Sequence, residues 1–252
     1  MQSDLDAVPP IKHPLREILH RLSDPALVAD TVIRGIMTAW DSVSPSDFAH
    51  LYRKIRTHTM CSDARLRSLY RSVKYVVSEK IPGDLVECGC ARGGSAALMG
   101  LTLAQAKDHR RLWLFDTFEG LPAPTSGDPD FEIADLFTGT CVGTATEVKN
   151  LFQHLAVDRD VQLVKGLFQD TLSSAGVDQI ALLHIDGDWY ESVKTCLENL
   201  YDKVVPGGII QFDDYGYWRG ARNAVDEFFA KRGIKAGLRR LDYSGRSLTK
   251  PT

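Results

Sequence analysis

Five short apolar runs, separated by amphipathic segments, constrain the fold of this chain more than any other feature. They predict β-strands at residues 85–88, 112–116, 161–165, 180–186 and 208–213. Apolar residues at helical spacing predict helices at about 95–106, 145–155, 190–204 and 220–232, with a short helix near Leu172. This alternation predicts an α/β fold with a doubly wound, Rossmann-like sheet. The tail from 234 to 248 predicts two edge strands that turn at Ser244 and Gly245.

The first 80 residues differ from this pattern, because they carry helical apolar stripes and several prolines but no predicted strand. The stripes consist of Leu15, Ile18, Leu19 and Leu22, of Val28, Val32, Ile33, Ile36 and Met37, and of Leu66, Leu69, Val73, Val76 and Val77. We expect an N-terminal helical extension at residues 1–80, which serves as a lid or packing surface, and one compact unit at 81–252. The extension also predicts a homodimer, since its stripes could pair with a second subunit.

The segment at 122–144 is rich in turn residues and has no clear period. It is long for a loop in a compact domain, so it is either disordered or a cover that faces the substrate. The identity of the substrate depends on this segment and on the N-terminal helices, whose conformations the sequence does not give.

Charge and composition exclude several classes of partner. The formal net charge is -3 at pH 7 and the basic residues are dispersed, so we expect neither nucleic acid nor an anionic membrane as a partner. No segment is long and apolar enough to span a bilayer, and the N-terminus does not resemble a signal peptide. The five cysteines lack the spacing of a zinc site and predict reduced thiols in a cytoplasmic protein.

Two acidic clusters follow the fourth and fifth apolar runs. Asp186 and Asp188 lie in HIDGDWYES, and Asp213 and Asp214 lie in GGIIQFDDYGYW. Both clusters could deliver carboxylates to the same edge of a parallel sheet, where open α/β folds bind their ligands. Because converging carboxylates repel one another, a hard divalent cation such as Mg2+ is the simplest partner for them. The sequence therefore predicts a metal-assisted enzyme.

A glycine-rich turn follows the first predicted strand, in DLVECGCARGGSAALM. Its spacing departs from the dinucleotide fingerprint, and Glu87 in this position suits a ligand with an ammonium or hydroxyl group better than a pyrophosphate. The second strand ends in Asp116, which is placed to accept hydrogen bonds from ribose hydroxyls. An acid near an amino acid moiety and an acid on a ribose together indicate S-adenosylmethionine.

Several ordered motifs carry a more specific resemblance. The segments RTHTM, ECGCARGGSA, FDTFEGLP, GLFQDTL, HIDGDWYES and VVPGGIIQFDDYGYWRGARNAVDEFF are similar, in that spacing, to the TylF or macrocin O-methyltransferase family over about residues 50–232. The resemblance implies a class I methyltransferase fold with an N-terminal helical lid. It also implies a Mg2+-dependent S-adenosylmethionine enzyme that methylates a sugar hydroxyl of a small-molecule glycoside in antibiotic biosynthesis.

The resemblance also implies roles for individual residues. The implied cofactor contacts are Thr59 and Met60 from the lid, Glu87, Gly89 and Gly93 at the methionine end, Asp116 and Thr117 at the ribose, and Gln169 and Asp170 beside the adenine. The implied metal ligands are Asp186, Asp213 and Asp214. A bound cation would lower the pKa of a sugar hydroxyl and orient it toward the methyl group.

The general base is open among four candidates. Asp188 is the first choice, because it lies two residues beyond Asp186 and need not be a ligand itself. Asp186 could serve both purposes. Some members of the family have a histidine where this chain has Trp189, which removes that base. His184 is better explained as a hydrogen-bonded strand residue, and His58, near the lid contact, remains a candidate.

Three other functions compete with this one. A catechol or phenol acceptor would use the same fold and cation. A nicotinamide-dependent oxidoreductase would bind a pyrophosphate at the first turn and would leave the acidic clusters unexplained. A degenerate, non-catalytic subunit would have no need of these acids and glycines.

Overall fold

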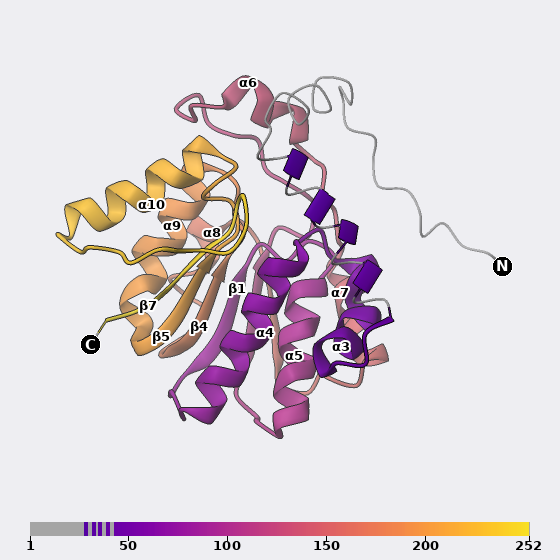
Figure 1. Cartoon of the computed structure of the whole chain (residues 1–252). Helices are drawn as coiled ribbons and strands as arrows, with labels where there is room; N and C mark the ends of the chain where they lie inside the picture. The colour runs from indigo at the N-terminus through magenta and orange to yellow at the C-terminus, as the bar shows by residue number, and fades with distance from the viewer. Residues whose placement is uncertain (1–27, 30–31, 34, 37–38, 41–42, 252) are drawn as a thin grey trace.

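The computed structural model describes residues 28–29, 32–33, 35–36, 39–40 and 43–251. They contain a seven-stranded sheet with the order β3-β2-β1-β4-β5-β7-β6 (Figure 1). Its strands are β1 Asp84–Cys88, β2 Leu112–Asp116, β3 Val161–Lys165, β4 Ile180–Ile185, β5 Val204–Phe212, β6 Arg239–Arg240 and β7 Arg246–Thr249. β1 to β5 are parallel, and β7 runs antiparallel to both β5 and β6. The predicted doubly wound α/β fold is confirmed.

The predicted boundaries differ from the structure mainly at the C-terminal half. β5 begins at Val204, four residues before the predicted strand at 208, and the preceding helix α9 ends at Leu200. A short 3-10 turn, Tyr201–Lys203, separates them. The tail forms the expected hairpin, but β7 pairs with β5, so that of these two strands β6 alone lies at an edge of the sheet.

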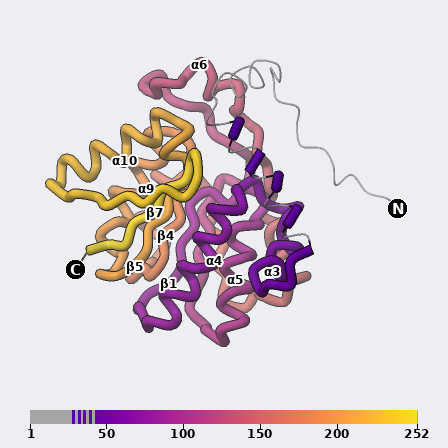
Figure 2. Tube along the Cα trace, in the orientation of Figure 1, coloured from indigo at the N-terminus to yellow at the C-terminus, as the bar shows by residue number. Residues whose placement is uncertain are grey.

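Helices cover both faces of the sheet, as Figure 2 shows along the chain trace. They are α5 Gly94–Ala106, α7 Ala145–His154, α8 Phe168–Thr171, α9 Tyr190–Leu200 and α10 Arg219–Lys231. Because side chains alternate along a strand, Val86 and Leu183 enter the core beneath α9 and α10. Leu85 and Leu182 enter the opposite core, which α5 and α7 share with the N-terminal helices.

The N-terminal helices pack directly on this second core. α3 Asp47–Ile55 begins at the N-cap Ser46, and α4 Asp63–Ser78 begins at the N-cap Ser62, each of which accepts a hydrogen bond from a backbone N–H of the first turn. The predicted stripe of α4 is buried against α5 and the sheet. The stripe at residues 15–22 lies outside the described residues, and the described residues of 28–40 are helical with exposed apolar side chains. The division of the chain at residue 80 remains a prediction.

The segment at 122–144 is a docked cover and contains α6, Phe131–Ala134. Asp128 Oδ1 accepts a hydrogen bond of 2.8 Å from the backbone N–H of Tyr190, at the start of α9. Asp130 Oδ2 accepts one of 2.6 Å from the N–H of Arg219, at the start of α10. Anions favour helix N-termini, so two aspartates fasten the segment to the helices that follow β4 and β5. Of the two interpretations drawn from the sequence, the structure supports the cover.

None of the helices in the described part of the chain combines the length and the apolar character that a membrane span requires.

Candidate active site

A cavity of about 440 Å³ opens at the carboxyl edge of the parallel strands. It is lined by the segments that follow β1, β2, β3, β4 and β5, by residues 57–61 before α4, by the cover at 122–144 and by the β6–β7 turn. This is the edge at which open α/β sheets bind their ligands. Most of the predicted acids and one predicted glycine therefore meet in one place, namely Asp116, Asp186, Asp188, Asp213, Asp214 and Gly89.

Three of the predicted aspartates form a compact oxygen cluster in this cavity. Asp186, Asp188 and Asp214 each offer a carboxylate oxygen, and these atoms lie within 4.8 Å of one another. Burial raises the pKa of Asp186 and Asp214 well above the usual range, and the neighbouring carboxylates add to the effect. Closely spaced carboxylate oxygens are the donor set that Mg2+ prefers, so these residues fit the predicted cation. Asp213 lines the same cavity but is not part of this compact group.

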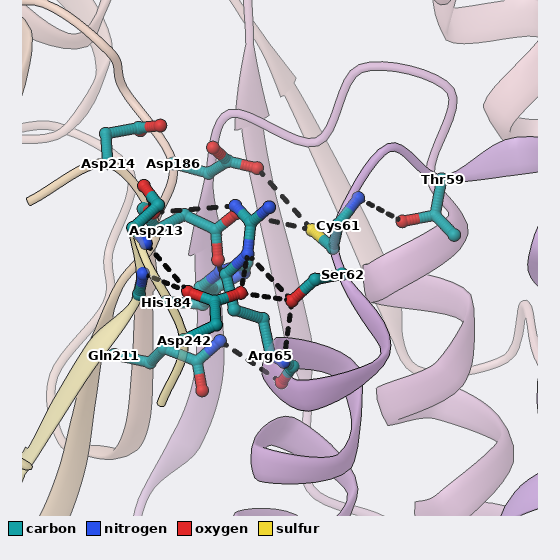
Figure 3. A network of polar contacts seen from close by, with 12 residues as sticks. Thr59, Cys61, Ser62, Arg65, His184, Asp186, Gln211, Asp213, Asp214 and Asp242 are labelled. Atoms are coloured by element: carbon teal, nitrogen blue, oxygen red, sulfur yellow. Dashed lines mark hydrogen bonds and ion pairs between the residues drawn. The ribbon is translucent and has the colours of Figure 1, made fainter. Parts of the chain in front are cut away.

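Asp213 is held by three side chains from other elements (Figure 3). Its Oδ1 lies 3.1 Å from His184 Nε2. Its Oδ2 accepts from the Arg65 guanidinium and, at 3.5 Å, from the Cys61 thiol. Burial raises the pKa of Asp213, but Arg65 and then His184 outweigh it and hold the pKa well below the usual range. Since a carboxylate offers about four acceptor sites, these three contacts leave room for a cation.

Arg65 and Cys61 were not predicted from the sequence. Arg65 lies in the first turn of α4, where the helix dipole disfavours a cation. Such a position requires acidic partners, and Arg65 has two: Asp213, and Asp242 in the β6–β7 turn, whose Oδ2 lies 3.1 Å from Arg65 Nε. The position of Arg65 in the first turn of a predicted helix is the one sequence feature that indicates acidic partners, but it does not show that these partners are Asp213 and Asp242.

The backbone and Trp218 fix the carboxylate of Asp188. The residue has a left-handed backbone with φ 55°, and its N–H donates to Asp214 Oδ2 at 3.1 Å. Trp218 Nε1 donates to Asp188 Oδ1 at 2.9 Å. Burial raises the pKa of Asp188 to about 6, although the Trp218 hydrogen bond opposes the shift. This environment suits a carboxylate that accepts a proton near neutral pH.

The two candidate histidines lie in different surroundings. His184 is fully buried, and its Nδ1 lies 2.7 Å from Glu87 Oε1 while Nε2 faces Asp213. Burial lowers its pKa, but the hydrogen bonds with Asp213 and Glu87 outweigh burial and raise it to about 10. His184 is therefore a hydrogen-bonded strand residue, as expected. It does not line the cavity, so it would not contact the substrate that accepts the methyl group. His58 lines the cavity, and burial, followed by the charge of Arg92, lowers its pKa.

Asp116 joins two loops beside the cavity. Its Oδ2 accepts from the backbone N–H groups of Cys90 at 2.8 Å and Ala91 at 2.9 Å. Its Oδ1 accepts from the N–H of Phe118 at 2.7 Å. The carboxylate thus organises the glycine-rich turn and also lines the cavity. The other predicted cofactor residues that line the cavity are Thr59, Met60, Gly89, Thr117 and Gln169.

Three predicted cofactor residues, Glu87, Gly93 and Asp170, are not among the residues that line the cavity, and their contact with the cofactor remains a prediction. Glu87 is fully buried and faces His184, because the two residues are paired across β1 and β4 and point to the same side of the sheet. Gly93 has φ 82° at the N-cap of α5 and faces Val148 of α7. Asp170 is exposed; neighbouring positions of a helical turn point about 100° apart, and here Gln169, itself exposed, lines the cavity whereas Asp170 does not.

Aromatic side chains form part of the cavity wall. Of the five aromatic residues that flank the acidic clusters in sequence, Tyr217 and Trp218 line the cavity, together with Phe137 of the cover. Trp189 is buried and donates from Nε1 to the carbonyl oxygen of Pro122 at 2.8 Å. The remaining two, Tyr190 and Tyr215, bond to acidic residues of α10. Two of the five aromatic residues and Phe137 therefore form an apolar wall of the cavity.

The strand order and the position of the cavity define the chain as a class I methyltransferase-type α/β enzyme. The family model described as Macrocin-O-methyltransferase (TylF) matches residues 52–250. The chain therefore belongs to the macrocin O-methyltransferase family and is an S-adenosylmethionine-dependent O-methyltransferase. This membership excludes the nicotinamide-dependent oxidoreductase.

Individual relatives agree with this assignment. The chain is 36% identical over 193 residues to demethyldecarbamoylnovobiocin O-methyltransferase of Streptomyces niveus, covering 75% of this chain and 74% of the relative. It is 34% identical over 194 residues to 8-demethyl-8-(2,3-dimethoxy-alpha-L-rhamnosyl)-tetracenomycin-C 4'-O-methyltransferase of Streptomyces olivaceus, with the same coverage of 75% and 74%. The solved structure of the O-methyltransferase NovP superposes with a TM-score of 0.73 at 35% identity, covering 77% of this chain and 83% of that one.

Proposed function

We propose that this chain transfers a methyl group from S-adenosylmethionine to a sugar hydroxyl of a glycosylated natural product, with Mg2+ as the metal cofactor. The observation that carries the proposal is the cluster of Asp186, Asp188 and Asp214, which borders the same 440 Å³ cavity as Gly89 and Asp116. One end of the cavity suits a nucleoside with an amino acid moiety. The other suits a cation and an acceptor with hydroxyl groups.

Asp186 and Asp214 of this cluster would hold the cation together with Asp213, whose carboxylate oxygen lies within 4.8 Å of an oxygen of Asp186, and Asp188 would stay outside the ligand set. A divalent cation at this place lowers the pKa of an acceptor hydroxyl and adds a positive charge among the carboxylates. The protein positions the reaction through the turns after β1, β4 and β5, which bring the cofactor residues and the acids to one edge of the sheet. The cover at 122–144 limits the access of water and orients the acceptor, which reduces the entropic cost of attack.

Asp188 would accept the proton of the attacking hydroxyl. Burial raises its pKa to about 6, which makes it a stronger base than an ordinary aspartate. Trp218 keeps the carboxylate in a fixed orientation through Oδ1. His58 is the second candidate, because it lines the same cavity and its lowered pKa keeps the ring neutral.

A glycoside acceptor is favoured over a catechol by the relatives. The name of the Streptomyces olivaceus enzyme places its methylation on a rhamnosyl-bearing tetracenomycin. In this chain the aromatic wall of Tyr217, Trp218 and Phe137 offers apolar faces against which a sugar or a planar aglycone can pack. The catechol alternative uses the same acids, so the choice of acceptor must be tested directly.

The test supplies methyl-labelled S-adenosylmethionine with a panel of glycosides, their aglycones and a catechol, in Mg2+ and in EDTA. We expect labelling of the sugar of a glycoside in Mg2+, loss of labelling in EDTA, and a much lower kcat for Asp188→Asn. Labelling that persists in EDTA would contradict the role of the cation. Labelling of the catechol alone would replace the glycoside by the alternative acceptor.

We also retain the homodimer as a proposal. Val32, Ile33, Ile36 and Trp40 are 58 to 64% exposed on the described helical residues before α3. A second subunit would cover these apolar side chains. Light scattering on the purified protein decides between a mass of about 28 kDa and twice that value.

A further inference from the structure

A buried chain of polar side chains lies beneath the acid cluster. Glu87 of β1 and His184 of β4 are paired in the sheet, and His184 is paired in turn with Gln211 of β5. His184 links two carboxylates: its Nδ1 lies 2.7 Å from Glu87 Oε1, and its Nε2 lies 3.1 Å from Asp213 Oδ1. Glu87 and His184 have no exposed surface, and Asp213 is 1% exposed. These three residues thus connect the sheet interior to the cavity wall, which Asp213 lines. Figure 3 shows the contact between His184 and Asp213.

The chemistry of this chain fixes the position of each member. Each ring nitrogen of His184 has one carboxylate oxygen within hydrogen-bond distance, so the ring is fixed at both ends. Hydrogen bonds to a carboxylate are short and directional, so they also fix the orientation of the two acids. Because His184 is attached to the central strand β4, it cannot follow a movement of the turn that carries Asp213. The Oδ1 of Asp213 is therefore anchored to the rigid part of the fold.

Stability alone does not explain why such groups lie here. A buried ionic chain contributes little compared with apolar residues of the same volume, because desolvation offsets the attraction. Within the described part of the chain, Glu87 Oε2 has no hydrogen-bond partner, which adds to the cost of burying this carboxylate. The compensating gain must lie elsewhere. Of Glu87, His184 and Asp213, Asp213 is the one that lines the cavity.

We propose that Glu87 and His184 are positioning residues of the cation site, which hold the Asp213 carboxylate by its Oδ1 and thereby set the affinity for a divalent cation. This inference rests on the proposed function, since it takes Asp213 as part of the cation site. It gives Glu87 a role different from the cofactor contact expected from the sequence. Residues that orient metal ligands commonly change metal affinity 10- to 100-fold when they are removed, so an effect of about that size is expected.

The test uses two substitutions of His184 that break opposite ends of the chain. In His184→Gln the amide nitrogen lies near the place of Nε2 and can still donate to Asp213. In His184→Asn it lies near the place of Nδ1 and reaches only Glu87. Gln211→Met is the matched control, because Gln211 is fully buried in the same row and donates to the Arg65 carbonyl oxygen rather than to an acid. Calorimetry measures the Kd for Mg2+ and, separately, for S-adenosylmethionine in EDTA.

We expect His184→Asn to weaken Mg2+ binding at least tenfold, His184→Gln to retain most of the affinity, and Gln211→Met to bind as the wild type does. The affinity for S-adenosylmethionine should stay the same in all three. Equal Mg2+ affinity in the two His184 variants, whether unchanged or equally weakened, would overturn the inference. If His184→Asn does not fold, Glu87→Gln replaces it, and unchanged Mg2+ affinity would be the contrary result. A wild type that binds no Mg2+ would instead refute the cation of the proposed function, and this inference with it.

Discussion

The Asp186→Asn substitution should stabilise the protein when no divalent cation is present. Oxygens of Asp186, Asp188 and Asp214 lie within 4.8 Å of one another. Two unit charges at such a distance repel by about 3 kcal/mol at an effective dielectric constant of about 20. Burial and the neighbouring acids raise the pKa of Asp186, so partial protonation already relieves part of this repulsion. We therefore expect the substitution to raise the free energy of unfolding by about 1 to 2 kcal/mol in EDTA.

The pH dependence of this gain follows from the direction of the shift. An aspartate with a raised pKa in the folded state costs nothing below its unfolded pKa of about 3.9. The cost grows as the pH rises from the unfolded pKa toward the folded one, because the unfolded chain has then lost a proton that the folded protein still binds, and it stays constant once both states have lost it. The difference between Asp186→Asn and the wild type should therefore be small at pH 4 and larger at pH 8.

Thermal unfolding followed by fluorescence measures this effect. For a chain of this size, 1 to 2 kcal/mol corresponds to an increase in Tm of about 2 to 8 °C. The control is Asp178→Asn, an exposed aspartate at the opposite end of β4, which should leave Tm unchanged. Adding Mg2+ should raise the Tm of the wild type but not that of Asp186→Asn. If Asp186→Asn in EDTA is no more stable than the wild type, the carboxylates do not repel one another and the electrostatic argument fails.

Two further substitutions test other parts of the site. The N–H of Trp218 bonds to Asp188 and lowers the pKa of that carboxyl, so Trp218→Phe should raise this pKa and move the acid limb of the kcat/KM profile to higher pH. Trp113→Phe, remote from the cavity, should leave the profile unchanged. An unshifted profile would argue against Asp188 as the base. Gly89→Ala places a Cβ on a backbone carbonyl of the turn after β4 at φ 85°, and we expect a loss of more than about 3 kcal/mol, measured by denaturant unfolding. Gly139→Ala, at φ 75° with no neighbour within 4 Å, should lower the free energy of unfolding by only about 1 kcal/mol. Equal losses in the two variants would show that backbone strain, and not the clash with the carbonyl, causes the loss at Gly89.

The sequence predicted most of the sheet and its acidic edge, because both depend on local patterns. Apolar runs that end in an acid identify strand and carboxyl edge together, so Asp116, Asp186 and Asp213 were placed correctly at the cavity. The role of Glu87 could not be predicted in the same way. Its partner, His184, is 97 residues away and is brought opposite it by the pairing of β1 with β4.

The N-terminal contribution to the site was also beyond local reasoning. Cys61 and Arg65 reach the acids because α4 packs across the sheet, and this packing depends on the whole core that α3, α4 and α5 share. A helical stripe predicts that α4 buries one face, but not which residue of its first turn meets a carboxylate. The contacts of the cover at 122–144 could not be predicted from local patterns either, because Asp128 and Asp130 bond to the first residues of α9 and α10, which are distant in sequence.

The central claim is that the carboxylates bind a divalent cation for methyl transfer, and calorimetric titration of Mg2+ into the protein saturated with S-adenosylmethionine tests it most directly. The wild type should bind one Mg2+, and Asp214→Asn should bind none while its affinity for S-adenosylmethionine is unchanged. Absence of Mg2+ binding in a wild type that binds S-adenosylmethionine, or equal binding in both proteins, would contradict the account.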